Sequence, residues 1–155
     1  MKSFRVLLVE DSASDVRLFR EALKETSGII QLAVVQDGFQ ATEYFRQAEV
    51  GLKARPDLVL LDWNLPLKDG REVLRDIKAS ATLKQIPVLI MTSSKAADDI
   101  RSAYSLNANC YLAKPSSLPE YIDVARSIED FWFKTATLPE NFPRSYREHH
   151  ARLAS

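Results

Sequence analysis

Five polar residues end or directly follow four apolar runs, and their side chains are of the types that bind a cation and a phosphoryl group. Glu10 and Asp11 follow one run, and Asp62 follows another. Thr92 ends a third run, and Lys114 follows a fourth. The carboxyl ends of parallel strands meet at one edge of a sheet, where α/β proteins bind their ligands. We therefore expect three carboxylates, a hydroxyl and an ammonium to meet at that edge.

The surrounding sequence alternates between strand and helix five times. Amphipathic stretches, most clearly that of residues 41–48, separate the apolar runs. Strands that are apolar throughout and separated by helices indicate a parallel sheet covered on both faces, a doubly wound α/β fold. The apolar runs predict five strands, at residues 4–10, 29–35, 58–61, 88–91 and 110–113.

Polar residues mark where several helices begin and end. Ser12 with Asp15 resembles a capping box at the start of the first helix, and Ser117 with Glu120 caps the last one. Asn107 follows the fourth helix, where we expect it in the left-handed conformation, as the commonest substitute for glycine.

The composition is that of one globular domain. The chain has 155 residues, enough for a single domain with a real core. Its 21 basic and 21 acidic residues cancel, which argues against partners such as nucleic acid or an anionic membrane. No apolar run approaches the roughly 20 residues that span a membrane. A single cysteine, and a strand that follows the N-terminus without room for a signal peptide, predict a cytoplasmic protein.

The set of a Glu-Asp pair, a lone strand-end Asp, a strand-end Thr and a Lys-Pro resembles the response regulator receiver domain. Thr92 lies 30 residues after Asp62, and Lys114 lies 22 after Thr92, as in that family. The resemblance implies a flavodoxin-like sheet of five parallel strands in the order 2-1-3-4-5 with five helices. It also implies a receiver domain at residues 1–134 and an extension at 135–155 without a separate output domain.

The same resemblance assigns the chemistry. Asp62 would accept a phosphoryl group from the phosphohistidine of a histidine kinase. Mg²⁺ would be bound by Asp11, Asp62 and the backbone carbonyl of Asn64, with Glu10 acting through water. Asn64 and Ser94 would flank the path of the attacking water and so tune dephosphorylation.

The resemblance also assigns the signalling residues. Lys114 would balance charge on the transferred oxygens, and Thr92 would hydrogen-bond the phosphoryl group. Tyr111 would turn inward when Thr92 moves, which would reshape the face of the fourth helix, fifth strand and fifth helix. The Lys114–Pro115 bond would be cis, a conformation that X-Pro bonds reach at low cost.

A finer resemblance is to small stand-alone response regulators that partner phytochrome-type histidine kinases. It rests on residues 9–12, 62–66, 69–74 and the ending at 131–139. The light-sensing chromophore would then belong to the kinase and not to this chain.

The last helix continues beyond the length that the fold needs. We place its apolar positions at Leu118, Ile122, Ala125 and Ile128, after which residues 131–133 are Phe-Trp-Phe. Consecutive helical residues are about 100° apart, so at least one of these aromatics should be exposed in a monomer. We therefore expect a homodimer, as in similar regulators. The alternative is that residues 138–143 fold back over the aromatics.

Two other functions are compatible with parts of the pattern. A haloacid-dehalogenase-type phosphatase also uses a strand-end Asp, but that family has a second acid where this chain has Asn64, and it carries a cap domain. A receiver-fold interaction module that takes no phosphate would have lost some of the chemical positions, all of which are filled. We expect Cys110 to pack in the interior, and His149 and His150 to be solvated.

Overall fold

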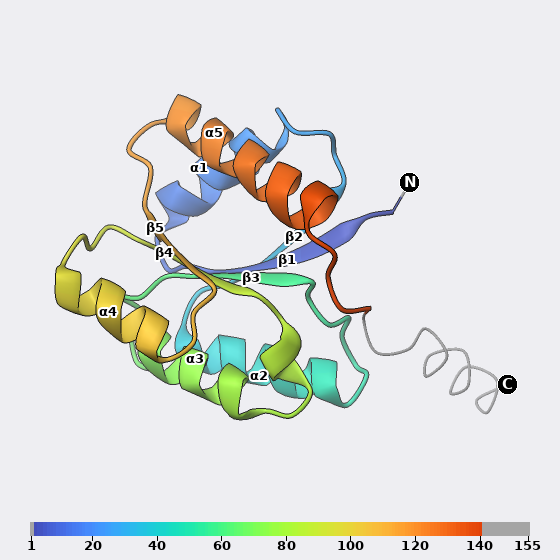
Figure 1. The fold of residues 1–155 in the computed structure, drawn as a ribbon, viewed down its shortest axis with the longest axis vertical. Helices are drawn as coiled ribbons and strands as arrows, with labels where there is room; N and C mark the ends of the chain where they lie inside the picture. The colour runs from blue at the N-terminus through green and yellow to red at the C-terminus, as the bar shows by residue number, and fades with distance from the viewer. Residues whose placement is uncertain (1, 141–155) are drawn as a thin grey trace, which may run out of the picture.

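A five-stranded parallel sheet forms the centre of the structure, a computed structural model that describes residues 2–140 (Figure 1). The strand order is β2-β1-β3-β4-β5, as predicted. Each strand is built mainly from the apolar runs, which are buried on both faces in β3 and β4. The strands are β1 (Phe4–Val9), β2 (Ile30–Val35), β3 (Leu58–Leu61), β4 (Val88–Thr92) and β5 (Cys110–Ala113).

Helices cover both faces of this sheet. Helices α1 and α5 pack on one face, and α2, α3 and α4 pack on the other (Figure 1). One apolar core therefore lies on each face of the sheet. A 3-10 turn, η1 (Leu83–Gln85), precedes β4. The helices are α1 (Ala13–Leu23), α2 (Gly38–Glu49), α3 (Gly70–Ala79), α4 (Ala97–Ser105) and α5 (Leu118–Ile128).

The predicted N-cap residues of α1 and α5 are confirmed, although the Ser12 backbone N–H donates to Glu10 and not to Asp15, as a full capping box would need. The Ser12 hydroxyl accepts a hydrogen bond from the Asp15 amide at 3.3 Å, and the Ser117 hydroxyl accepts one from the Glu120 amide at 3.4 Å. Asn107 has φ 69°, the left-handed conformation expected after α4. Local sequence therefore fixes where α1 and α5 begin, and each of these starts lies beside the carboxyl edge of the sheet.

The buried face of α5 differs from the prediction. Tyr121 is fully buried, whereas Leu118 is 37% exposed. A tyrosine can occupy the core when its hydroxyl finds a partner, and here it donates a hydrogen bond to Asp15 at 2.7 Å. The prediction counted only aliphatic residues and so missed the largest fully buried side chain.

A π-helical turn, η2 (Glu129–Thr135), extends α5 and carries the three aromatics. Phe131 is 53% exposed, as the helical spacing predicted for at least one of them. Phe133 is buried and stacks on Phe4 with ring centroids 4.4 Å apart, while Trp132 is half-buried. Leu138 packs against the same core, so part of the chain after η2 does fold back. Residues 141–143 lie outside the described residues, as do His149 and His150.

Two further sequence predictions bear on the described part of the chain. Cys110 is half-buried, and burial raises the pKa of its thiol, as suits a packing residue. Within residues 2–140 there is no helix with the length and apolar character needed to cross a membrane.

Candidate functional site

The carboxyl edge of the sheet brings the five predicted residues together. The register pairs Val9 of β1 with Leu61 of β3, so Glu10 and Asp62, which follow them, are neighbours. Thr92 of β4 pairs with Ala113 of β5, which places Lys114 one residue beyond this pair. The site therefore follows directly from strand order and register.

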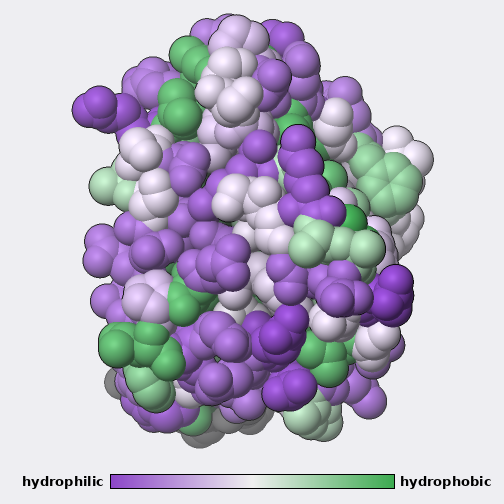
Figure 2. Space-filling view, turned by 90° about the vertical axis from the view of Figure 1, so that its left-hand side faces the viewer, coloured by the Kyte–Doolittle hydropathy of each residue, from purple (hydrophilic) through white to green (hydrophobic). Residues whose placement is uncertain are grey.

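The surface over this edge is mostly hydrophilic, with apolar side chains scattered among polar ones (Figure 2). Beneath it, however, the central groups are withdrawn from solvent. Glu10 is 1% exposed, Asp62 4% and Thr92 0%, whereas Asp11 and Asn64 are exposed. The site is thus a buried polar cluster with an open rim, which suits a small ionic ligand.

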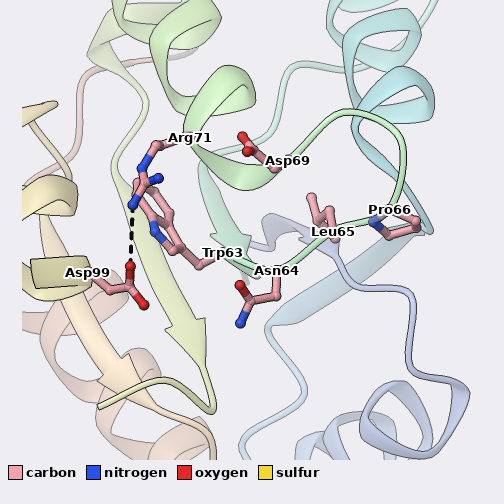
Figure 3. A pocket seen from close by; sticks show the side chains of 7 residues that line it. All are labelled: Trp63, Asn64, Leu65, Pro66, Asp69, Arg71 and Asp99. Atoms are coloured by element: carbon pink, nitrogen blue, oxygen red, sulfur yellow. Dashed lines mark hydrogen bonds and ion pairs between the residues drawn. The ribbon is translucent and has the colours of Figure 1, made fainter. Parts of the chain in front are cut away.

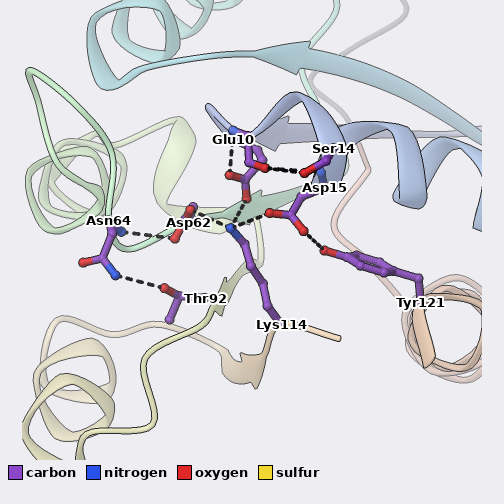
Figure 4. A network of polar contacts seen from close by, with 9 residues as sticks. Glu10, Ser14, Asp15, Asp62, Asn64, Thr92, Lys114 and Tyr121 are labelled. Carbon is purple, nitrogen blue, oxygen red and sulfur yellow. Dashed lines mark hydrogen bonds and ion pairs between the residues drawn. The ribbon is translucent and has the colours of Figure 1, made fainter. Parts of the chain in front are cut away.

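Lys114 lies at the centre of this cluster (Figure 4). Its ammonium donates a hydrogen bond to Asp62 Oδ2 at 3.0 Å and forms ion pairs with Glu10 Oε2 at 2.9 Å and Asp15 Oδ2 at 3.1 Å. Burial alone would lower the pKa of the ammonium, but the Glu10 and Asp62 carboxylates outweigh burial and raise that pKa above its ordinary value. Lys114 is therefore a fixed positive charge.

The sequence did not identify Asp15 as a site residue. Asp15 Oδ1 accepts the hydrogen bond from the Tyr121 hydroxyl, so α1 and α5 meet at the ion pair with Lys114 (Figure 4). Its position three residues after Ser12 also suits the start of α1, where its backbone N–H donates to the Ser12 hydroxyl. The contact with Tyr121 spans 106 residues, and no local pattern signals a contact of that kind.

An acidic cluster is present beside Lys114. Each of Glu10, Asp11 and Asp62 offers a carboxylate oxygen, and these atoms lie within 4.8 Å of one another. Burial, together with the nearby Asp62 charge, raises the pKa of Glu10 to about 7 despite the Lys114 ammonium. Clustered oxygen donors of like charge are the environment that hard divalent cations favour, so these residues fit a metal of that class.

The Thr92 hydroxyl, on the other side of Asp62, is held more loosely than the Lys114 ammonium. Asn64 donates its backbone N–H to Asp62 Oδ1 at 3.1 Å, and its side-chain amide reaches the Thr92 hydroxyl at 3.5 Å (Figure 4). The second contact is at the long limit for a hydrogen bond. Thr92 thus faces the site with a weakly held hydroxyl.

A chain of polar contacts runs from Tyr111 through Ser94 and Asp99 to Arg71. The half-buried Tyr111 donates its hydroxyl hydrogen to the Ser94 carbonyl oxygen at 2.8 Å, and the Ser94 hydroxyl donates to Asp99 Oδ2 at 2.5 Å. Asp99 pairs with Arg71 at 3.3 Å, and the guanidinium lies 5.3 Å from the centre of the Trp63 ring.

An open pocket of about 370 Å³ beside the site is lined in part by Trp63, Arg71 and Asp99 (Figure 3). Asn64, Leu65 and Pro66 form another part of its wall. The contacts that begin at Tyr111 therefore connect β5, the loop after β4, α4 and the start of α3, and they end at residues that line this pocket.

A close backbone approach fixes the loop that follows Asp62. Gly70, the first residue of α3, donates its N–H to the Trp63 carbonyl at 3.1 Å. A Cβ built on Gly70 would lie 2.4 Å from the Asp62 carbonyl oxygen, closer than real Cβ atoms come. Only glycine allows α3 to begin directly against the backbone of Asp62.

One expectation about Lys114 is wrong. None of the peptide bonds within residues 2–140 is cis, so the Lys114–Pro115 bond is trans. The trans form of an X-Pro bond is lower in free energy by about 0.5–1 kcal/mol. The ammonium reaches Asp62 with this bond in place, so a cis bond is not needed to aim it.

Comparison with known proteins identifies the family to which the chain belongs. The response regulator receiver domain model matches residues 6–126. This chain belongs to that family. It is therefore a response regulator of two-component signalling, in which receiver domains take phosphoryl groups from histidine kinases.

Its similarity to two curated proteins extends over most of their length. The chain is 45% identical over 135 residues to response regulator Rcp1 of Synechocystis sp., covering 86% of this chain and 92% of that protein. It is 39% identical over 129 residues to the probable methanogenesis regulatory protein FilR2 of Methanothrix harundinacea, covering 83% of each.

Solved structures of response regulators are also similar to this chain over most of its length. The phosphorylated cyanobacterial phytochrome response regulator RcpA superposes with a TM-score of 0.83 at 45% identity, covering 89% of this chain and 99% of that one. The Mn²⁺-bound form of Rcp1 gives a TM-score of 0.79 at 44% identity, covering 88% and 99%. The family match and these likenesses leave the haloacid-dehalogenase interpretation without support.

Proposed function

We propose that Asp62 is the phosphoacceptor of this response regulator. One observation supports this role best. The Asp62 carboxylate is almost fully buried at the end of a strand, and one of its oxygens lies 3.0 Å from the Lys114 ammonium. An Asp62 oxygen would form the new bond to phosphorus while the bond from phosphorus to the kinase's histidine nitrogen breaks. Lys114 neutralises charge on the transferred oxygens, since a fixed ammonium in a dry site stabilises developing negative charge strongly.

The divalent cation of this site is Mg²⁺. Asp11, Asp62 and the carbonyl of Asn64 would hold it, with Glu10 acting through water. When bound, Mg²⁺ supplies charge neutralisation at the phosphoryl oxygens. The exposure of Asp11 supports this assignment, because Mg²⁺ keeps several of its own waters.

Thr92 and Tyr111 form the conformational switch. The Thr92 hydroxyl binds a phosphoryl oxygen on Asp62, and Tyr111 then leaves the Ser94 carbonyl and turns inward. This changes the surface of α4, β5 and α5. The weak Asn64 contact of Thr92 and the single carbonyl that holds the Tyr111 hydroxyl support a switch of low energetic cost.

The phosphoryl group is removed by the chain itself. Water attacks the phosphorus of phosphorylated Asp62 along the path flanked by Asn64 and Ser94. The bond from phosphorus to the Asp62 oxygen breaks, which releases inorganic phosphate and restores the carboxylate. Asn64 is exposed and both side chains are small and polar, which leaves this path open.

The kinase partner is of the phytochrome type. Similarity to Rcp1 and to the phytochrome response regulator RcpA over most of both chains supports this choice. The protein acts in the cytoplasm, for which its single cysteine is suited. Residues 1–134 act as the receiver domain, and residues 135–155 follow it as an extension.

The phosphoacceptor is tested by treating the protein with acetyl phosphate and Mg²⁺ and weighing it by mass spectrometry. We expect an acid-labile adduct with the mass of one phosphoryl group. Asp62→Asn should lose it, because the amide is not a competent nucleophile, and Asp123→Asn, at an exposed aspartate of α5, should keep it. An adduct on the Asp62→Asn protein would contradict the assignment. No adduct on either the unaltered protein or the control would favour the interaction module.

The kinase assignment needs a different experiment. Phosphotransfer should be profiled against the organism's histidine kinases at short times, where the preferred partner transfers fastest. We expect a phytochrome-type kinase to be that partner, and preferential transfer from another class would refute the assignment.

We also propose a homodimer that uses the end of α5 and η2. Phe131 is 53% exposed there, and exposed aromatics often mark an interface. Light scattering over a concentration series should show a dimer that Phe131→Ala weakens. Phe39→Ala, at a phenylalanine of α2 that is 59% exposed, is the matched control and should leave the dimer intact. A full-length protein that stays monomeric with and without phosphorylation would refute the dimer.

A further inference from the structure

Lys114 has a carboxylate partner that is absent from the proposed phosphotransfer chemistry. Asp15 belongs to α1, outside the acidic cluster, and its Oδ2 lies 3.1 Å from the ammonium. Figure 4 shows the ammonium between Asp62 on one side and Asp15 on the other. An ammonium has three N–H donors, and three carboxylates lie within 3.1 Å of this one: Glu10, Asp15 and Asp62.

Asp15 is itself held in place by Tyr121. The Tyr121 hydroxyl donates to Asp15 Oδ1 at 2.7 Å, which leaves Oδ2 for Lys114. The Tyr121 ring is fully buried and packs against the Phe19 ring in a T-shaped arrangement, with ring centroids 6.4 Å apart. The tyrosine is thus fixed by the core between α1 and α5, and it fixes the carboxylate in turn.

The protonation states support this arrangement. Burial, assisted by the Asp15 charge, raises the pKa of the Tyr121 hydroxyl, so it remains a donor. Burial works against ionisation of Asp15, but hydrogen bonds from Tyr121, Ser12 and Lys114 prevail and lower its pKa. Asp15 is therefore a charged acceptor with both oxygens engaged.

We propose that Asp15 and Tyr121 are positioning residues, which hold the Lys114 ammonium beside Asp62 before and after phosphoryl transfer. The inference rests on the proposed role of Asp62. A lysine side chain has four flexible carbons, and fixing it at a site costs rotamer entropy. Transfer converts one Asp62 oxygen into part of the new bond to phosphorus, so the ammonium then depends on its contacts with Glu10 and Asp15. The Asp15 contact persists through the step, because neither of its partners reacts.

Two substitutions separate positioning from other effects. Tyr121→Phe removes one hydroxyl and retains the ring that packs on Phe19. Asp15→Asn removes the charge and retains the size. Removing a negative charge near the site should by itself favour an anionic phosphodonor. Positioning predicts the opposite sign, a slower reaction, so the direction of the change discriminates between the two.

The experiment measures the rate of phosphorylation by acetyl phosphate at saturating Mg²⁺. We expect Asp15→Asn to lower the rate about tenfold, at the lower end of what outer partners of reactive groups contribute, and Tyr121→Phe to lower it less. Thermal unfolding checks that each variant is folded, and Asp123→Asn is the control, which should react at the unaltered rate. If Asp15→Asn does not fold, Tyr121→Phe decides alone.

A second measurement reports on Lys114 without any reaction. The ¹⁵N-resolved signal of a lysine ammonium is visible when its hydrogens exchange slowly with water, as they do when carboxylates hold them. We expect the Lys114 signal to broaden in both variants and to persist in the control. Failure of the unaltered protein to accept phosphate would refute the role of Asp62, while the ammonium signal would still test the positioning. Rates equal to or above the unaltered rate, or an unchanged Lys114 signal, would overturn the inference.

Discussion

The two sides of Asp62 are held in contrasting ways. On one side the Lys114 ammonium meets three carboxylates at 2.9–3.1 Å, and Asp15 among them is tied to the core through Tyr121. On the other side the Thr92 hydroxyl has a contact with Asn64 at 3.5 Å. Both sides lie at the same sheet edge and derive from strand ends of the same kind, so the difference comes from side chains and not from the backbone.

The contrast separates chemistry from signalling. A group that stabilises charge acts best when it is already in place, because it then needs no reorganisation during the reaction. A group that reports the reaction must change position with little cost. The dense side, formed by Lys114 and its three carboxylates, thus suits phosphoryl transfer. The loose side, formed by Thr92 and Asn64, suits the response to it.

The strongest test of this contrast compares one substitution from each side. Lys114→Ala should slow phosphorylation by acetyl phosphate about 100-fold, the loss typical of a preorganised charge-stabilising group. Thr92→Ala should slow it by less than about tenfold, since a neutral hydrogen bond contributes about 1 kcal/mol. Mass spectrometry over time gives both rates. Similar losses in the two variants would show that the sides do not divide the work in this way.

The next test removes an acid that does not touch Lys114. Asp11→Ala should weaken Mg²⁺ binding by at least about tenfold, because opposite charges a few ångströms apart near a protein surface attract by a few kcal/mol. Trp63 adjoins Asp62, so its fluorescence can follow the titration. Glu72→Ala, at an exposed acid on α3, is the control. Unchanged affinity in Asp11→Ala would mean that the acidic cluster is structural.

A pH series sharpens the picture of the dense side. Glu10 has a pKa of about 7, so it carries a proton below that pH and a charge above it. Mg²⁺ affinity should therefore rise by about tenfold between about pH 6 and pH 8, because metal binding displaces the proton. Glu10→Gln should flatten this rise, as measured by the same fluorescence titration. A rise of equal size in Glu10→Gln would assign it to another group.

The smallest effects are expected at the rim of the loose side. Bulky substitutions such as Asn64→Met or Ser94→Tyr should change the lifetime of the phosphorylated state about threefold to tenfold, the range in which one hydrogen bond or one ordered contact acts. Phosphorylation itself should persist in both. The lifetime is followed by the loss of the adduct after removal of acetyl phosphate. Unchanged lifetimes in both variants would exclude these positions from the path of the water.

The fold and the five strand-end residues were predictable from sequence for a physical reason. Buried parallel strands are apolar along their whole length, so the runs before Glu10, Asp62 and Lys114 stand out from the amphipathic helices. Chain order then determines which strand ends share an edge. Capping residues such as Ser117 were predictable because their hydrogen bonds join residues three apart.

Contacts between distant segments were not predictable in this way. Asp15 and Tyr121 each have a local interpretation, as a capping residue and as a helix residue, and neither reveals the hydrogen bond that joins them. Arg71 and Asp99 likewise lie in separate helices, 28 residues apart, and meet only because α3 and α4 cover the same face of the sheet. Pairings of this kind depend on three-dimensional packing, which one sequence does not display.

The start of α3 has a consequence for how this site tolerates change. Gly70 has no side chain and takes no part in the proposed chemistry, yet a single added carbon there would collide with the backbone oxygen of Asp62. A survey of substitutions across the chain should therefore find position 70 about as restrictive as the acids themselves. Such a survey would therefore find intolerant positions beyond the residues with reactive groups. The site also depends on the absence of a side chain at Gly70, because the backbone of Asp62 leaves no room for one.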